Sequence, residues 1–198
     1  MAVNCRFSGG SIAAGILLIA IAAGMFLYDI GSAALAAKDA DAILAQIDQR
    51  MPALVERVPQ ERGNNTMASM EIDGVNIVGT IELEKYGLRL PIAAGWDADL
   101  LPSMPCRFTG SIYDESLIIG ASDEEGQLSC ATSMEVNDLI VLTDMEGGRY
   151  TYTVEAIRHS SHADLEKLQE GNFALTIFVK DSSSATTQYL LIRCRWGE

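Results

Sequence analysis

The sequence has little positive charge, and this scarcity limits the classes of partner that the protein can bind. Its 198 residues carry 14 Lys and Arg against 27 Asp and Glu, a net charge of −13. Because the phosphates of nucleic acids require a basic face on the protein, this balance argues against nucleic acid as a partner. The chain also lacks a glycine-rich phosphate-binding loop, and Gly147-Gly148 is expected in a hairpin turn instead.

Metal ligands are equally scarce, since the chain has two histidines and four cysteines. No cysteine pair has the spacing of a zinc finger, and His159 and His162 straddle the start of an expected helix. The acidic run 123–125 (Asp, Glu, Glu) could hold calcium weakly, but a solvated loop is the favoured interpretation. We therefore expect no metal and no cofactor.

Charged residues are absent from positions 7–28, which are rich in Ile, Leu, Ala and Gly. An apolar helix needs about 20 residues to cross a membrane, so this segment predicts an uncleaved anchor. The alternative is a signal peptide cleaved near Ala34-Leu35-Ala36, but its apolar region usually has only about 7–15 residues. Arg6 precedes the segment and Asp29 follows it, which predicts a single-pass cell-membrane protein with an extracellular C-terminal domain.

An amphipathic helix is expected next, broken or kinked at Pro52 because proline lacks the amide donor. We expect its apolar side to pack on the following domain, and the alternative is a stalk that pairs with another helix. The resulting domains are 1–37 (membrane anchor), 38–69 (amphipathic helix and linker) and 70–198 (β-barrel). The apolar positions of the helix pattern are Leu35, Ile43, Leu44, Ile47, Met51, Leu54, Val55 and Val58.

From Met70 onward the pattern changes to short strands rich in β-branched residues. The turn residues Asp144–Gly148 between two such segments predict a hairpin. Ser161–Asp164 resembles a capping box that opens a short helix through Leu168. Many short strands with small helical insertions predict a mainly β fold, a closed or nearly closed barrel. The expected strands are 75–83, 88–92, 117–120, 139–143, 150–157, 175–179 and 189–193.

Several phrases of the sequence, taken in order, resemble the sortases, which are cysteine transpeptidases of Gram-positive cell surfaces. They match a clostridial class B/D-like branch. The resemblance covers nearly the whole chain and implies an N-terminal anchor, an amphipathic helix and a sortase-like closed β-barrel. The phrases are Ile72-Asp73-Gly74, YGLRLPI (86–92), MPCRFTGS (104–111), LIIGASD (117–123), Tyr150-Thr151-Tyr152, ALTIFVKD (174–181) and YLLIRC (189–194).

The catalytic positions depart from the family. A sortase carries His after the segment 117–121, Cys at the end of the strand 175–179 and Arg at the start of the last strand. These places are occupied by Ser122, Lys180 and Tyr189 (or Gln188). A thiolate must attack the peptide carbonyl, an imidazole must protonate the leaving amine, and an arginine must stabilise the oxyanion. The resemblance therefore implies a catalytically inactive pseudo-sortase with a peptide-binding or regulatory role.

Two other functions stay open. Ser122 and Lys180 could act as nucleophile and base in an active transpeptidase or hydrolase that anchors or polymerises surface proteins, although Asp123 could instead form an ion pair with Lys180. The chain could also be a structural ectodomain whose stalk helix associates with other membrane proteins. Expected partners are the membrane and a surface-protein or pilin peptide, or an active sortase.

The four cysteines give little information about function, and their possible modification or pairing depends on their positions in the chain. Cys5 precedes the apolar segment and so is not a lipoprotein acceptor. Cys106, Cys130 and Cys194 are an odd number, so at most one disulfide can form among them. Cys106 and Cys194 are the favoured pair if one forms, and two reduced, buried cysteines are an equally good interpretation.

Overall fold

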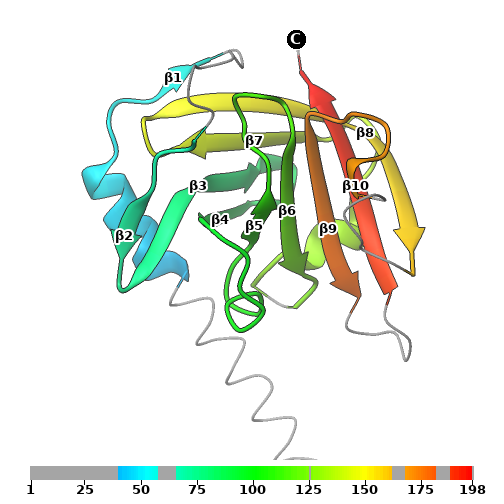
Figure 1. Ribbon diagram of the computed structural model, residues 1–198, viewed down its shortest axis with the longest axis horizontal. Coiled ribbons are helices and arrows are strands. Elements are labelled where there is room, and N and C mark those ends of the chain that lie inside the picture. Colours follow the sequence, from blue (N-terminus) through cyan, green and yellow to red (C-terminus); the bar gives the residue numbers. More distant parts are fainter. Residues whose placement is uncertain (1–39, 58–65, 125, 162–167, 182–187, 198) are drawn as a thin grey trace, which may run out of the picture. The chain divides into compact units, whose positions relative to one another are not determined.

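The computed structural model describes residues 40–57, 66–124, 126–161, 168–181 and 188–197. Ten strands and two short 3-10 helices follow a helix over residues 40–50 (Figure 1). In chain order these elements are β1 (Val55–Glu56), β2 (Met70–Ile72), β3 (Val75–Leu83), η1 (Glu84–Tyr86), β4 (Leu88–Ala93), β5 (Cys106–Thr109), β6 (Leu117–Ser122), η2 (Ser129–Ser133), β7 (Leu139–Asp144), β8 (Gly148–Ser160), β9 (Leu175–Asp181) and β10 (Gln188–Trp196).

Eight of these strands close into a ring. The pairing runs β3–β4–β5–β6–β9–β10–β8–β7 and returns to β3 through its ladder with β7. β6 and β9 are parallel, β4 and β5 are parallel, and the other pairs of the ring are antiparallel. Closure leaves no free edge within the ring. The predicted mainly β, closed barrel is thus confirmed for the described residues.

The strands expected from the sequence are all present, and β3 has the predicted bounds. β1, β2 and β5 were not predicted because they span only two to four residues, too few to show a period of two. Leu139, the first residue of β7, is 56% exposed, because this end of the strand lies at the surface.

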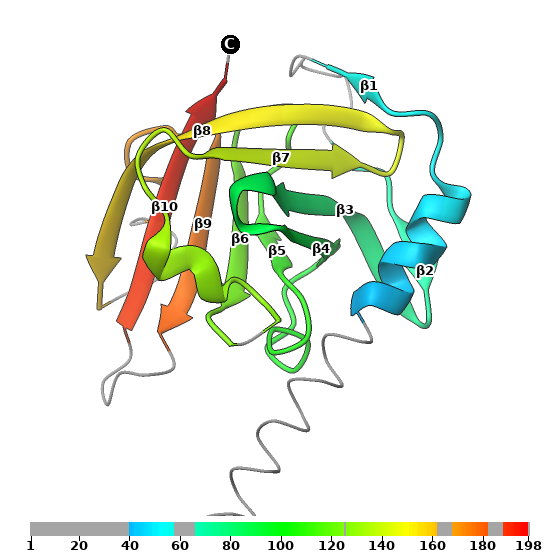
Figure 2. The ribbon, with the colours of Figure 1, turned by 180° about the vertical axis from the view of Figure 1, so that it is seen from behind.

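The interior of the barrel is a continuous apolar core. Each strand contributes alternate residues to it, because successive side chains point to opposite faces of a sheet. On β6, β9 and β10 these inward residues include Ala121, Val179 and Leu190. η2 closes one end of the core with Leu128 and Ala131 and lies on the inner side of these three strands (Figure 2).

The helix over residues 40–50 packs on the barrel through Ile43, Leu44 and Ile47, which join a second apolar cluster with Ile72 and Ile77. This confirms the favoured interpretation of its apolar side. The helix ends before Pro52, and the pattern predicted beyond that residue is not helical. Instead Leu54 and Val55 are exposed, and Val55 and Glu56 form β1 beside the start of β8.

The predicted hairpin joins β7 to β8 and is organised by a buried carboxylate. Oδ1 of Asp144 accepts hydrogen bonds from the amides of Glu146 (2.9 Å) and Gly148 (2.8 Å). Oδ2 accepts hydrogen bonds from the hydroxyls of Tyr113 (3.2 Å) and Tyr150 (3.1 Å). Four donors therefore replace the water that the fully buried carboxylate has lost.

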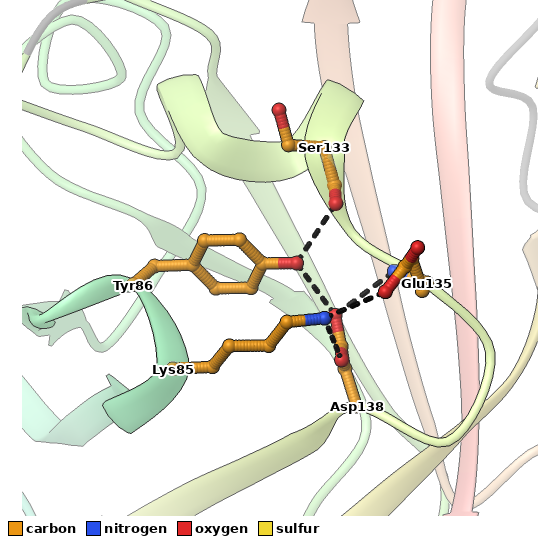
Figure 3. Close-up of polar contacts among 5 residues, drawn as sticks. All are labelled: Lys85, Tyr86, Ser133, Glu135 and Asp138. Carbon is orange, nitrogen blue, oxygen red and sulfur yellow. Dashed lines mark hydrogen bonds and ion pairs between the residues drawn. The ribbon is translucent and has the colours of Figure 1, made fainter.

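A second polar centre ties η1 to the segment before β7 (Figure 3). The amine of Lys85 donates to Asp138 (2.7 Å) and Glu135 (2.8 Å). The hydroxyl of Tyr86, which has one proton to donate, lies within hydrogen-bonding distance of both Asp138 (2.6 Å) and the carbonyl of Ser133 (2.8 Å). Burial alone would raise the pKa of Asp138. Hydrogen bonds from Lys85, Tyr86 and the amide of Glu135 outweigh that effect and lower the pKa.

Some of the sequence predictions concern residues that the structure does not describe. The predicted anchor (7–28) and most of the expected helix through Leu168 lie outside the described residues, as do the linker positions 59–65. Within the part of the chain that is described, no helix is long and apolar enough to cross a membrane. The boundaries 1–37, 38–69 and 70–198 stay predictions.

Candidate functional site

The three residues at the expected catalytic positions lie side by side at one end of three adjacent strands. Ser122 on β6 is in register with Lys180 on β9, and Lys180 is in register with Tyr189 on β10. Neighbouring strands lie about 4.8 Å apart. Since Ala121, Val179 and Leu190 point into the barrel core, Ser122, Lys180 and Tyr189 point to the outer face. The fold therefore brings together the residues that the sequence analysis singled out.

Ser122 is buried, with 5% of its surface exposed, and it organises the loop that follows. Its hydroxyl accepts a hydrogen bond from the amide of Glu124 (3.3 Å), and its carbonyl accepts one from the amide of Leu128 (3.1 Å). In the same loop the side-chain amide of Gln127 donates to the carbonyl of Ser103 (2.6 Å). The serine thus has a structural role in this turn.

Lys180 is exposed and forms no hydrogen bond or ion pair with the residues that the structure describes. A serine nucleophile needs its base within about 2.6–3.2 Å. Ser122 and Lys180 share a face and a register, but no hydrogen bond joins them. The alternative ion pair with Asp123 is not formed among the described residues either.

Tyr189 belongs to an aromatic cluster on the outer face, made of Trp96, Phe108, Phe178 and Tyr189. The first three rings are in mutual contact, with centroids 5.4–5.5 Å apart, and Tyr189 meets Phe178 edge-on at 6.2 Å. The cluster covers Gly120, where an added methyl group would overlap Trp96 and lie 2.6 Å from Phe178. Aromatic side chains therefore cover the outer face next to the three candidate positions.

The sequence analysis did not identify Trp96 or Phe108 as part of this face. Trp96 lies in the loop between β4 and β5, and Phe108 lies in a strand too short to be predicted. Gly120, a lone glycine inside a β-strand pattern, was the available signal, because such a glycine marks a close approach by another group.

No described cysteine is placed to act as a nucleophile on this face. Cys106 and Cys194 are fully buried in two different apolar clusters, and Cys130 on η2 packs against the barrel core. All three are free thiols, so the Cys106–Cys194 disulfide is not formed. Burial raises the pKa of each thiol, which keeps it in the unreactive neutral form.

The remaining candidates for acid–base or metal chemistry are dispersed. His159 is exposed near the end of β8, whereas His162 and Glu125 lie outside the described residues. Asp123 and Glu124 follow β6 directly. Within the described ranges, no group of three or more His, Cys, Asp or Glu side chains could hold a metal ion.

Comparison with known proteins agrees with this architecture. No family model and no curated protein sequence matches the chain. Among solved structures, sortase C1 from Streptococcus agalactiae is similar with 22% identity and a TM-score of 0.54, over 65% of this chain and 71% of that one. Sortase A from Listeria monocytogenes is 18% identical with a TM-score of 0.53, over 62% of this chain and 88% of that one.

A third similar structure contains a ligand. It is Clostridium perfringens sortase C with the C-terminal cell wall sorting motif, which is 16% identical with a TM-score of 0.53, over 62% of this chain and 71% of that one. Identities this low establish the fold alone. The chain has a sortase-like fold, and its chemistry must be argued from its own residues.

Proposed function

We propose that this chain is a membrane-anchored pseudo-sortase, which binds an extended peptide at the cell surface without transferring it. The main support for this proposal is the identity of three neighbouring residues on the adjacent strands β6, β9 and β10. Ser122, Lys180 and Tyr189, which the resemblance places at the histidine, cysteine and arginine positions of a sortase, are in register on these strands. An alcohol and an amine are weaker nucleophiles than a thiolate, and a phenol lacks the guanidinium charge that balances an oxyanion. Cys106 and Cys194 are buried, Cys130 is partly buried, and burial raises the pKa of each thiol.

Peptide binding is supported by the same face. Phe178 on β9 meets Phe108 on β5 and Tyr189 on β10 edge-on. Trp96, which is 42% exposed, packs against both phenylalanines and presents an aromatic ring to solvent. Aromatic side chains provide large contact areas at a low cost in conformational entropy. A similar sortase C is solved with a sorting motif, so a peptide that resembles a sorting signal is the first ligand to test.

The alternative function is acyl transfer by Ser122 and Lys180. The register of these two residues favours it, because they are aligned on neighbouring parallel strands. The hydroxyl of Ser122 argues against it, because this hydroxyl accepts a hydrogen bond from the amide of Glu124 and forms none with Lys180.

The proposed membrane anchoring is supported by the uncharged segment 7–28 and by the charges that flank it.

Trp96 offers a direct test of peptide binding, because the only other tryptophan is Trp196. In a Trp196→Phe background, sorting-signal peptides should change the emission of Trp96. Replacing Trp96 by Ala should weaken binding about tenfold or more, the loss expected for an aromatic anchor worth more than ~1.4 kcal/mol.

Val136→Ala is the matched control, because Val136 is also exposed but belongs to the segment before β7. Peptide binding that responds equally to both substitutions, or no binding by any sorting-signal peptide, would exclude this face as the binding site.

A further inference from the structure

A hollow of about 420 Å³ opens on the outer face of β8 and β10, beyond the aromatic cluster. We call it the basic hollow, and it is lined by Arg158, His159, Ser160, Glu170, Leu191 and Arg193.

Arg193 presents a fixed guanidinium to the basic hollow. Ile192 and Cys194 point into the barrel core, so Arg193 points to the outer face. Its side chain is only 8% exposed, and its guanidinium carbon lies 5.3 Å from the centre of the Phe173 ring. The guanidinium carbon of Arg195 lies at the same distance from that ring. Stacking on an aromatic ring holds a guanidinium in one orientation, which favours planar recognition of an anion.

The lining of the hollow holds two guanidiniums and one carboxylate, in contrast to the acidic chain as a whole. The carboxylate of Glu170, which is 68% exposed, forms an ion pair with Arg193 at 3.8 Å. Arg158, which is in register with Leu191 of β10, is exposed and has no ion pair with any described residue. A cationic hollow on a protein with a net charge of −13 attracts anions selectively.

The position of the basic hollow connects it to the candidate site. Tyr189 and Arg193 point to the same face of β10 and are four residues apart. Four residues of extended chain span about 14 Å. A peptide that lies extended beside β10 and reaches Tyr189 would place another of its residues, about four positions away, at Arg193.

We propose that the basic hollow binds a carboxylate of the peptide ligand, about four residues from the position that contacts Tyr189. This inference rests on the proposed function, since it requires that a peptide binds on this face. A carboxylate can accept two parallel hydrogen bonds from one guanidinium, which is the geometry that a stacked arginine offers. The carboxylate can be an internal Asp or Glu side chain or the C-terminus of the peptide.

A peptide array separates these possibilities. Each peptide sequence is synthesised in three forms. The first has one Glu and a C-terminal amide, the second has Gln in place of that Glu and a C-terminal amide, and the third has the same Gln and a free C-terminal carboxylate. The full chain is applied to the array. We expect at least one form with a carboxylate to bind about tenfold more tightly than the form with Gln and a C-terminal amide, because a charge-assisted bidentate contact contributes a binding free energy of that size. The preferred form identifies the source of the carboxylate.

Two variants test whether the basic hollow is responsible for this preference. Arg193→Gln should abolish it while leaving binding of the neutral peptides unchanged. If thermal melting shows that this variant is unfolded, Arg158→Gln decides, because Arg158 is exposed, and the preference should fall in that variant too. Arg50→Gln, on the helix, removes one exposed charge elsewhere and should retain the preference.

The outcomes separate the two proposals. If peptides bind without any preference for a carboxylate, this inference is overturned and the proposed function stays intact. The same conclusion follows if the preference for a carboxylate is unchanged in the Arg193→Gln and Arg158→Gln variants. If no peptide of any composition binds, both fail.

Discussion

Two polar centres of the barrel differ in how completely the chain satisfies them. At the β7–β8 turn, four donors surround the buried carboxylate of Asp144. At the ends of β6 and β9, the hydroxyl of Ser122 accepts one long hydrogen bond from a backbone amide, and the side chain of Lys180 has no partner among the described residues. The first centre joins distant segments through buried hydrogen bonds, whereas few interactions depend on the side chains at the second. The comparison teaches that the barrel is held together away from the candidate positions, so the side chains there can change while the fold is kept.

The largest expected effect is at the first centre. Asp144→Ala leaves two amides and two hydroxyls without their acceptor, and hydrogen bonds to a charged group contribute about 1.5–3 kcal/mol each. We expect the free energy of unfolding to fall by about 3 kcal/mol or more, which corresponds to about 6–12 °C in a thermal melt followed by circular dichroism.

The control for Asp144 is Asp48→Ala. Asp48 accepts hydrogen bonds from Arg89 at 2.7 and 2.9 Å but lies at the surface, so its removal should cost no more than about 1 kcal/mol. Equal losses in the two variants would refute the contrast between the turn and the surface.

The aromatic cluster gives the next effect. Gly120→Ala forces a methyl group against Trp96 and Phe178, and overpacking of this kind costs about 1–3 kcal/mol. Because Trp96 is the more exposed ring, we expect it to swing outward and its fluorescence to shift to longer wavelength. Gly95→Ala, where a methyl group would meet no atom within 4 Å, should change neither quantity.

A smaller effect depends on pH. The pKa of Asp138 is lowered in the folded chain, so the stability it contributes is present above the unfolded pKa, about 3.9, and is lost as the pH falls through the folded value. Asp138→Asn should therefore flatten the decline of melting temperature below about pH 4. Asp99→Asn, in an exposed loop, is the control for the loss of one negative charge. A decline identical in wild type and Asp138→Asn would contradict the network of Figure 3.

The smallest effect is expected at the candidate site. Lys180→Ala should change the free energy of unfolding by no more than about 0.5 kcal/mol, as is usual for an exposed side chain without partners. A double-mutant cycle of Ser122→Ala with Lys180→Ala should show coupling below about 0.5 kcal/mol. Larger coupling would indicate that the two side chains form a dyad after all.

The sequence predicted most of the barrel because its longer strands have clear β-branched and apolar patterns. β3 was predicted to the residue, and the hairpin followed from the turn residues Asp144–Gly148. The resemblance also implied that Ser122 and Lys180 lie close enough to act as nucleophile and base, and the two residues are indeed in register on neighbouring strands. Ser122 ends β6, and Lys180 and Tyr189 lie one residue from the ends of β9 and β10, so the pairing of strands fixes the proximity of the three residues.

Other features could not be predicted because they depend on contacts between distant segments. The loop that carries Trp96 is placed over β6 by tertiary packing, with no local signal except Gly120. Beyond Pro52 the apolar residues Leu54 and Val55 continue the helical spacing, yet that segment pairs with β8 instead. Arg193 lies in a strand pattern, and only its stacking on Phe173 distinguishes it from an ordinary surface arginine.

The most direct test of the central claim is a turnover measurement on the wild-type protein. Sorting-signal peptides are incubated with the full chain and an amine acceptor, and cleaved, transferred and enzyme-linked products are detected by mass spectrometry. The account predicts bound peptide and none of these products. Turnover that Lys180→Ala removes would contradict it and would establish Ser122 and Lys180 as a catalytic pair.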